Sequence, residues 1–558
     1  MRREVSVVNK KVCSFPILFA LLALLIGTCA VVFPASAQAA PTSTGSITVS
    51  GTVARSYDAY QIFSANVVDG DSDAKIATDL AWVSDAARDA VLPVLHSAGM
   101  PNSQTTAQEA AEWLNTDSHL TSALSAQLAR SLQSSGAESV ALNAGTATEL
   151  PCGYWLIVAD DDAIAQNEAG TAPIMALVGG SAVTVKPKAA TPKVAKHVLE
   201  DSTAAWGKAA DATVADDLYW RLSATVPAGL SAYDTYAVQF VDTMSAGLDP
   251  SKVVASMHVY VAAGADGGFD AVSTGKDGRA GTEPAKGWTD ITAQCATKVA
   301  ADGTFTVRTG DLIAALGGAD AFAAGARVVA VYDAPLNGAC NHGIAKGNPN
   351  EVYLRYPRSP FADQSGDAGF TRTPSDDATA YTWDLALIKR SSNGDKPLAG
   401  AVLSITDDRG RTLAADGTWD AGGKATVTTG EDGRVTVSGV DSGKLEVREL
   451  KAPKGYTAFE GTRSVTVKAE GLDVDQVAAA KPKLTITAES PLRADSADGS
   501  TGSLEASLIN TPTKDSPRGD MPSTGDMAMY AAAAVAVAGA ALIVVALLVK
   551  RGGGSHKE

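Results

Sequence analysis

Cysteine and histidine are scarce in this sequence. The chain has 5 cysteines and 6 histidines among 558 residues, and it contains neither a CxxC pair nor a Cys/His cluster. This spacing gives no indication of a metal site. The scattered histidines and the lack of GxSxG and HExxH motifs also argue against a hydrolase site. We therefore expect no cofactor and no enzymatic activity.

Basic residues are also in the minority. Lys and Arg number 46 against 62 Asp and Glu, which gives a formal net charge of −16. An acidic exterior repels a phosphate backbone and keeps copies of a chain apart in solution. The charge balance thus excludes nucleic acid as an expected partner, and the length leaves room for about three domains.

Long apolar runs mark the two ends of the chain. Val12–Phe33 follows four basic residues and precedes Ala-Ser-Ala, as in a secretory signal peptide that is removed on export, here residues 1–39. Met527–Val549 would make roughly 34 Å of helix, enough to cross a bilayer. The basic pair after it, Lys550 and Arg551, is typical of a cytoplasmic end.

Removal of the leader leaves three cysteines, Cys152, Cys295 and Cys340. Cys295 and Cys340 fall in one predicted domain, so they are a candidate disulfide in an oxidising exterior. The alternative is that all three are unpaired, small, buried side chains. The sequence leaves both interpretations open.

Between residues 41 and 512 the pattern is mainly β. Short runs rich in Val, Thr, Tyr and Leu alternate with Gly, Asp, Pro and Asn. These runs are Ser46–Val53, Ala182–Lys186, Val328–Asp333, Val352–Tyr356, Thr382–Lys389, Arg434–Ser438 and Ser464–Lys468. Helical spacing of Trp, Leu and Ala is confined to Ala81–Ser97 and Ala107–Ser134. We expect tandem immunoglobulin-like β-sandwiches, the first with helical insertions.

Three polar or Pro-rich stretches mark the expected domain boundaries. They are Lys186–Pro192, Asp363–Ala378 and Thr511–Asp520. Proline forces the residue before it into an extended conformation, which suits a linker. The predicted parts are a signal peptide (1–39), an N-terminal domain (40–188), a middle domain (189–375), a C-terminal domain (380–512) and a stalk with the membrane helix and basic tail (513–558).

The segment before the C-terminal apolar run resembles the LPxTG sorting signal of Gram-positive surface proteins. It consists of Met521, Pro522, Ser523, Thr524 and Gly525, with Met521 at the position of Leu. In that family a sortase cuts between the Thr and the Gly and joins the Thr carbonyl to an amine. The resemblance implies a secreted protein that is held in the membrane before sorting and is then anchored to the peptidoglycan of the cell wall.

The end of the N-terminal domain resembles the pilin motif of sortase-assembled shaft pilins, in which a strand ends in Tyr-Pro-Lys. Val183–Lys188 reads Val-Thr-Val-Lys-Pro-Lys, so Lys186 replaces the Tyr while Pro187 and Lys188 match. The resemblance implies that the Lys188 amine accepts Thr524 of another copy. It also implies sortase, further copies of the chain, ancillary pilins, peptidoglycan and host surface ligands as classes of partner.

The C-terminal domain resembles Cna-B-type domains. Leu445–Tyr456 matches their E-box (YxLxExxAPxGY) at the Glu, Ala-Pro and Gly-Tyr positions, with Leu445 and Val447 as departures. The resemblance implies an intramolecular isopeptide bond between Lys389 and Asn510, promoted by the acid Glu449.

The middle domain resembles the fimbrial isopeptide-forming domain of the same pilins. The matching segments are Pro192–Val198, Gln239–Leu248 and Gly347–Tyr356. They imply a bond between Lys196 and Asn350 with Asp242 as the promoting acid, and Asn348 is the alternative to Asn350. The N-terminal domain lacks a comparable set, and we expect no bond there.

Lysine, a carboxylic acid and asparagine are residue types that suit formation of an isopeptide bond. An amine attacks an amide only when it is neutral, and burial between sheets lowers a lysine pKa while it raises a carboxyl pKa. A protonated acid can then polarise the Asn carbonyl, and the fold holds the reactants together at high effective concentration. Ammonia leaves and a Lys–Asn amide remains.

Two classes of surface protein fit these motifs. A shaft pilin uses Lys188 for head-to-tail polymerisation into a fimbrium, whereas a monomeric wall-anchored adhesin has the same isopeptide domains and treats Lys188 as a linker charge. A minor or basal pilin lies between them. A surface-anchored enzyme is the third class, and no motif selects it.

Overall fold

The computed structural model describes most of the chain between residues 43 and 513. The gaps are residues 52–54, 71–73, 117–118, 161–163, 188–189, 229–231, 276–278, 361, 363, 473, 475 and 478–479. The signal peptide, the sorting signal, the predicted membrane helix and Lys188 all lie outside the described residues. The chain forms two compact units, one of Met1–Thr382 with Glu470–Pro482 and one of Trp383–Ala469 with Lys483–Glu558.

The first unit begins with two sheets that enclose an apolar core. The smaller sheet has the order β5-β1-β8, and the larger has the order β3-β2-β6-β7 with β4 also paired to β2. Its strands are β1 (Thr44–Val49), β2 (Ser56–Asp69), β3 (Lys75–Trp82), β4 (Ser139–Asn143), β5 (Ala147–Pro151), β6 (Gly153–Ala159), β7 (Ile174–Val178) and β8 (Val183–Val185). Alternate residues such as Ile47, Val49, Trp155 and Ile157 fill the space between the sheets.

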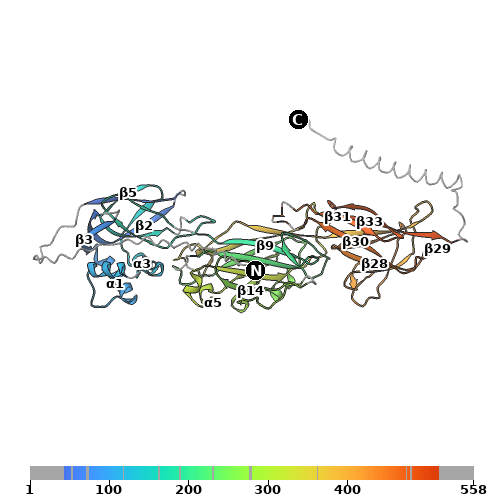
Figure 1. Ribbon diagram of the computed structural model, residues 1–558, viewed down its shortest axis with the longest axis horizontal. Helices are drawn as coiled ribbons and strands as arrows, with labels where there is room; N and C mark the ends of the chain where they lie inside the picture. The colour runs from blue at the N-terminus through green and yellow to red at the C-terminus, as the bar shows by residue number, and fades with distance from the viewer. Residues whose placement is uncertain are drawn as a thin grey trace, which may run out of the picture. The chain divides into compact units, whose positions relative to one another are not determined.

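Three helices, α1 (Asp85–Ser97), α2 (Ala107–Asn115) and α3 (Ser122–Ser135), pack on the other face of the larger sheet (Figure 1). Each begins at a capping side chain, Ser84, Thr106 or Thr121, that accepts a backbone N–H of the first turn. The pattern over 107–134 is therefore two helices, and α1 starts only after β3 has ended. Their buried Leu and Ala residues form a second core.

The middle part of the first unit is a pair of sheets packed face to face. One sheet contains β10 (Ala205–Gly207), β9 (Lys193–Glu200), β12 (Tyr219–Val226), β18 (Ala326–Asp333), β14 (His258–Ala263) and β15 (Thr289–Asp290) in that order. The other contains β11 (Ala209–Asp211), β21 (Asp376–Tyr381), β19 (Asn348–Pro357), β13 (Gln239–Met244), β17 (Thr304–Arg308) and β16 (Ala296–Val299), with β20 (Phe370–Arg372) on β19. Short helices lie in the connections, α4 (Val253–Ser256), α5 (Leu312–Ala315) and α6 (Ala319–Phe322).

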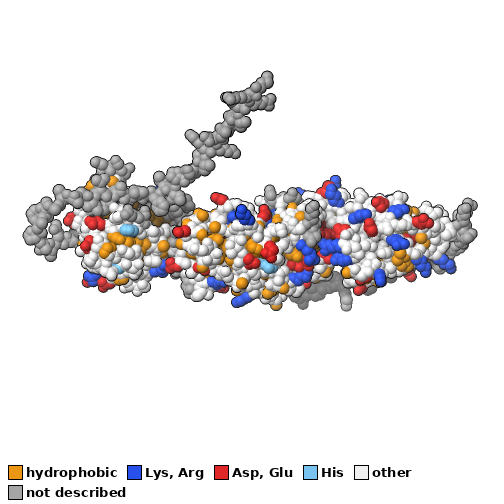
Figure 2. All heavy atoms as spheres, turned by 60° about the horizontal axis from the view of Figure 1, so that its bottom comes forward, with side chains coloured by type: hydrophobic (Ala, Val, Ile, Leu, Met, Phe, Trp, Pro, Cys, Tyr) orange, Lys and Arg blue, Asp and Glu red, His pale blue; other side chains and the backbone are white. Residues whose placement is uncertain are grey.

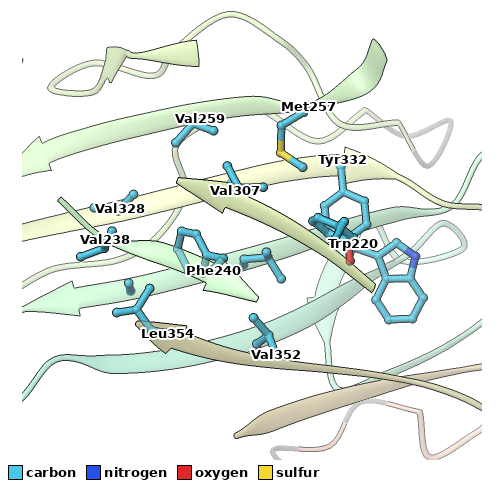
Figure 3. Close-up of a cluster of buried hydrophobic side chains, with 14 of the residues drawn as sticks. Trp220, Val238, Phe240, Met257, Val259, Val307, Val328, Tyr332, Val352 and Leu354 are labelled. Atoms are coloured by element: carbon cyan, nitrogen blue, oxygen red, sulfur yellow. The ribbon is translucent and has the colours of Figure 1, made fainter. Parts of the chain in front are cut away.

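Both sheets contribute to one apolar core (Figure 3). Trp220, Val328 and Tyr332 come from one sheet, and Phe240 and Val352 come from the other. This core surrounds the first of the two polar clusters described below.

The stretch 363–378, expected as a polar joint, contributes strands to this part. β20 and β21 both pair antiparallel with β19. Ala378 and Ala380 on β21 are fully buried, so small apolar residues at alternate positions override the polar composition.

The second unit also has two sheets. One contains β27 (Arg434–Val440), β22 (Trp383–Ser391), β33 (Ser503–Pro512) and β29 (Tyr456–Thr457), with β32 (Leu492–Asp498) on β33. The other contains β25 (Trp419–Asp420), β24 (Thr412–Leu413), β23 (Val402–Thr406), β28 (Gly443–Lys451), β30 (Thr462–Glu470) and β31 (Lys483–Ala488), with β26 (Val427–Thr428) on β23. β22 and β33 run parallel.

The expectation of a mainly β chain with few helices is confirmed. Each of the seven strand runs predicted from the sequence overlaps an observed strand. No helix within the described residues is long and apolar enough to cross a membrane. On the face seen in Figure 2, acidic and basic side chains are interspersed.

The described cysteines form no disulfide. The Sγ of Cys295 donates to the carbonyl of Ile291 at 3.3 Å, and the Sγ of Cys340 lies 3.7 Å from Nε2 of His342. Of the two interpretations of the cysteines, the structure supports separate thiols.

Candidate functional site

A lysine, an aspartate and an asparagine meet inside the middle part of the first unit. Lys196 lies on β9 of one sheet, whereas Asp242 on β13 and Asn350 on β19 belong to the facing sheet. All three residues are fully buried. Lys196 Nζ contacts Oδ2 of Asp242 as an ion pair.

Alternation along the strands brings these side chains inward. On β9, Lys196, Val198 and Glu200 are buried at every second position, and Lys196 is in register with Leu222 of β12. Asp242 and Asn350 likewise lie at inward positions of neighbouring antiparallel strands, where Asp242 pairs with Val352 and Asn350 with Met244. A one-residue shift of either register would turn the side chains outward.

Burial shifts both ionisable groups toward their neutral forms. It lowers the pKa of Lys196 to about 8, against the opposing effect of Asp242. It raises the pKa of Asp242, against the opposing effect of Lys196 and hydrogen bonds. An ion pair in so apolar a place carries a large desolvation penalty, which transfer of the proton from the amine to the carboxylate would relieve.

The amide of Asn350 is only partly satisfied. Its Nδ2 donates to the hydroxyl of Tyr332 at 2.9 Å, but its Oδ1 is buried without a hydrogen-bond partner. Oδ1 of Asp242 is also buried without a partner. A protonated Asp242 gains an O–H donor, and the Asn350 carbonyl is an unused acceptor in the same cluster, so the two groups suit polarisation of the amide by the acid.

The side-chain amide of Asn348, the alternative to Asn350, makes hydrogen bonds to backbone groups. Its Oδ1 accepts the N–H of Asn341 at 2.8 Å, and its Nδ2 donates to the carbonyls of Asn341 and Ala380 at 2.9 and 3.2 Å. These bonds tie a turn to β21 and leave the amide occupied. The geometry therefore favours Asn350.

Sequence reasoning missed Tyr332 on β18. Its hydroxyl accepts from Lys196 Nζ at 2.8 Å and donates to Asp242 Oδ2 at 3.1 Å, in addition to its contact with Asn350. Lys196 Nζ also lies 5.3 Å from the ring centroids of Tyr332 and Trp220. The only signal in the sequence was a single hydroxyl-bearing residue within the apolar run Val328–Tyr332.

A second cluster of the same type lies in the second unit. Lys389 on β22 and Asn510 on β33 come from adjacent parallel strands, and Glu449 on β28 comes from the other sheet. Lys389 Nζ contacts Asn510 Oδ1 and lies 3.1 Å from Glu449 Oε1. Asn510 Nδ2 donates to both oxygens of Glu449 at 2.9 and 3.1 Å.

This second cluster is buried and held in place by its surroundings. The side chains of Lys389 and Glu449 are fully buried, and Asn510 is nearly so. The backbone N–H of Phe459 donates to Glu449 Oε2 at 3.0 Å, and the Phe459 ring lies 5.8 Å from Lys389 Nζ. Burial lowers the pKa of Lys389 to about 8, against the opposing effect of Glu449.

The lysines of the N-terminal domain have contrasting environments. Lys75 is held by the carbonyls of Gly179 and Ser181 at 2.6 and 2.7 Å and by Asp69 at 3.2 Å. Lys186 is exposed and directly follows β8. The predicted acceptor Lys188 lies two residues further on, outside the described part of the chain.

Among the described residues, no group of three His, Cys, Asp or Glu side chains could hold a metal ion. The residues of the predicted sorting signal, Met521 to Gly525, lie beyond the described part. The structure thus brings together the four predicted isopeptide residues and their two acids, and it leaves the sortase-related positions as predictions.

Comparison with known proteins gives one family match and one curated relative. Residues 384–481 match the family described as SpaA, prealbumin-like fold domain. The trypsin-resistant surface T6 protein of Streptococcus pyogenes serotype M6 is 30% identical over 129 residues, which is 22% of this chain and 22% of the relative. The alignment thus spans about a fifth of that protein's length.

Solved pilin structures are also similar to the chain. The T6 backbone pilin of Streptococcus pyogenes aligns over 84% of this chain and 98% of its own, with 16% identity and a TM-score of 0.45. The full-length major pilin SpaD of Corynebacterium diphtheriae aligns over 85% of this chain and 100% of its own, with 16% identity and a TM-score of 0.42.

Proposed function

We propose that this protein is the structural shaft subunit of a covalently polymerised cell-surface pilus, stabilised by two internal Lys–Asn isopeptide bonds. The observation that carries the proposal is the burial of two separate Lys–acid–Asn clusters, each with its lysine pKa lowered to about 8. The match of residues 384–481 to a SpaA domain supports it. In this role the protein is a structural component and not an enzyme.

Each proposed bond forms by the same transamidation. The neutral amine of the lysine attacks Cγ of the asparagine, the new Nζ–Cγ bond forms, and the Cγ–Nδ2 bond breaks. The proton lost from Nζ balances the one gained by Nδ2, which leaves as ammonia. Asp242 and Glu449 are the acids that polarise the amide and handle the proton.

In the second cluster the amide must turn before it reacts. Asn510 Oδ1 faces Lys389 and its Nδ2 faces Glu449, which suits an ammonium and a carboxylate. After proton transfer from the lysine to the acid, a 180° rotation of the amide places the carbonyl oxygen toward the protonated Glu449.

The two bonds would brace their domains differently. Lys196 and Asn350 come from facing sheets, so their bond would join one sheet to the other. Lys389 and Asn510 come from adjacent parallel strands, so their bond would fix the first strand of that unit to the last. In the second unit, tension along the chain could then not peel the first and last strands apart, whereas in the middle part β20 and β21 follow Asn350 and lie outside the closed loop.

Polymerisation would use the exported chain. In this proposal sortase opens the bond between Thr524 and Gly525, and Lys188 of the next copy accepts the Thr carbonyl. The open head-to-tail arrangement grows as a filament, and the last subunit passes to peptidoglycan. The signal peptide, the membrane helix after the sorting signal and immunoglobulin-like sandwich domains belong to the same proposal.

An immunoblot of boiled, SDS-treated cell-wall extract tests the polymer. Cells that make the wild type should give a high-mass ladder, and cells that make Lys188→Ala should give monomer. Lys186→Ala is the matched control, because Lys186 is the exposed neighbour on the same linker, and it should keep the ladder.

Other outcomes of this experiment have defined meanings. A single band in all strains would reject the polymer and favour the monomeric wall-anchored adhesin. A ladder that survives Lys188→Ala but collapses in Lys186→Ala would move the acceptor to Lys186. Intact-mass measurement of the mature protein tests the internal bonds separately, because each bond removes the mass of one ammonia.

A further inference from the structure

The polar cluster of the middle domain contains one group that the proposed chemistry has not used. The hydroxyl of Tyr332 contacts the attacking nitrogen of Lys196 at 2.8 Å, the acid oxygen of Asp242 at 3.1 Å and the leaving nitrogen of Asn350 at 2.9 Å. Within the described part of the chain, Asn350 Nδ2 donates to Tyr332 and makes no direct hydrogen bond to Lys196 or Asp242.

We propose that Tyr332 is a catalytic residue of the middle-domain reaction, a proton relay between Asp242 and the ammonia that leaves Asn350. This inference rests on the proposed isopeptide chemistry and adds a residue and a step to it. A tyrosine hydroxyl is suited to a relay because it donates one proton and accepts others at the same oxygen.

The relay is balanced in protons. Lys196 first gives a proton to Asp242, which leaves a neutral amine and a carboxylic acid. As the Nζ–Cγ bond forms and the Cγ–Nδ2 bond breaks, Tyr332 passes its hydroxyl proton to Nδ2 and takes the proton of Asp242. The carboxylate then removes the extra proton from Nζ. The products are the amide, ammonia, a neutral tyrosine and a protonated Asp242.

The position of Tyr332 is well fixed. The residue is fully buried on β18, its ring packs edge-on against Phe305 with centroids 4.8 Å apart, and Trp220 lies beside it at one end of the core (Figure 3). Burial raises the pKa of Tyr332 well above its usual range, so the hydroxyl keeps its proton until a strong base needs it. The nitrogen of an expelled amide is such a base.

The second cluster provides an internal comparison. There the Asn510 amide hydrogen-bonds Glu449 directly, at 2.9 and 3.1 Å from Nδ2, so no side chain stands between the acid and the amide. Only the middle cluster needs a relay, because there the hydroxyl stands between the acid and the amide.

The test is the rate at which each bond forms after the urea-unfolded, uncrosslinked full mature chain is refolded. Uncrosslinked chain is isolated as the linear fraction from cells grown with short induction, and tryptic mass spectrometry counts the two crosslinks over time. Tyr332→Phe should slow formation of the Lys196–Asn350 bond about 100-fold, the lower end of the range for acid–base groups, and leave formation of the Lys389–Asn510 bond unchanged.

Tyr260→Phe is the matched control, because this buried tyrosine on neighbouring β14 also donates one hydrogen bond, to the carbonyl of Thr282 at 2.7 Å. It should leave both rates unchanged. If Tyr332→Phe forms the middle bond at the wild-type rate, the relay is wrong. If the wild type never forms that bond, the proposed chemistry of the middle domain fails independently of Tyr332.

A second variant covers the case in which Tyr332→Phe does not fold. Site-specific 3-fluorotyrosine at position 332 keeps the ring and the hydroxyl but makes the phenol more acidic. A relay that donates to the leaving group predicts faster formation of the middle bond. An unchanged or slower rate, with the Lys389–Asn510 bond as internal reference, would overturn the relay.

Discussion

At the residue scale, two asparagines on the same strand have different proposed roles, Asn350 as the reacting amide and Asn348 as a structural one. Asn350→Ala should abolish the middle crosslink, so the intact mass rises by one ammonia relative to the change expected from the substitution. Asn348→Ala should keep the crosslink, because Asn348 only ties Asn341 to Ala380. Intact-mass spectrometry of both variants checks this. A crosslink lost in Asn348→Ala and kept in Asn350→Ala would reverse the assignment.

The lowered pKa of Lys196 predicts a pH dependence in the uncrosslinked protein. In Asn350→Ala the folded amine loses its proton near pH 8, whereas the unfolded amine keeps it to about 10.5. Between these values the unfolded state holds more protons, so stability rises with pH, by about 1.4 kcal/mol for each pH unit. Below pH 8 this gain is absent, and the raised pKa of Asp242 contributes with the opposite sign once the pH rises above its ordinary value.

Labelling of the buried thiol of Cys340 gives the urea midpoint of Asn350→Ala, and the change of this midpoint between pH 7 and 10 measures the slope. The crosslinked wild type is the control, because its Lys196 nitrogen is an amide and no longer titrates. An identical slope in both proteins would contradict the buried-amine interpretation.

At the scale of elements, strand β28 presents one glutamate inward and another outward. Glu449→Gln should prevent the Lys389–Asn510 bond, because a neutral amide can neither take nor return the proton. Loss of this bond should lower the free energy of unfolding by about 4.7 kcal/mol, the chain-entropy value for a closed loop of about 100 residues. Glu446→Gln on the same strand is the control, since Glu446 is exposed and pairs with the exposed Lys444. Crosslink mass and urea midpoint check both variants, and a bond that still forms in Glu449→Gln would exclude the acid role.

Lys75 links the β2–β3 hairpin to the turn before β8. Its ammonium bonds the carbonyls of Gly179 and Ser181, and its side chain is only 11% exposed. Lys75→Ala leaves these carbonyls and Asp69 without the ammonium, and it should destabilise the N-terminal domain by about 1–3 kcal/mol. The urea concentration at which the buried thiol of Cys152 becomes reactive measures the stability of this domain, with Lys186→Ala as the neutral control. Equal midpoints for the two variants would contradict a structural role of Lys75.

The strands could be predicted from the sequence more fully than their pairing. Runs of apolar residues located β18 and β22, which are buried at nearly every position, and alternation located β19, which has one inward face. Neither pattern revealed that residues 376–381 form a strand, since their buried face is made of small alanines. The Lys and Asn partners emerged only through resemblance to known domains, because they are far apart in sequence. Tyr332 was missed for the same reason, because its role depends on three residues from other strands.

At the scale of the first unit, two domains meet through residues 165–170 and helix α3 of the N-terminal domain. The backbone N–H groups of Asn167 and Gly170 donate to the carbonyls of Arg372 and Arg358 at 2.8 and 2.6 Å. Arg130 on α3 pairs with Asp234 of the middle domain at 2.7 Å. The N-terminal domain is therefore held against its neighbour by hydrogen bonds and an ion pair, whereas the neighbour has the proposed covalent brace.

This contrast predicts an order of unfolding. As temperature rises, the thiol of Cys152 in the N-terminal domain should become reactive before that of Cys340 in the middle domain. The reason is that the Lys196–Asn350 bond lowers the entropy of the unfolded middle domain, whereas no such bond is expected in the N-terminal domain. Both thiols are buried in the folded protein, so their labelling reports the opening of each domain. In Asn350→Ala, which lacks the crosslink, the labelling temperature of Cys340 should fall toward that of Cys152. In Asn348→Ala, which keeps the crosslink but loses hydrogen bonds, the labelling temperature of Cys340 should stay above that of Cys152. Labelling of Cys340 before Cys152 in the crosslinked wild type would show that docking, and not the isopeptide bond, sets the stability of the first unit.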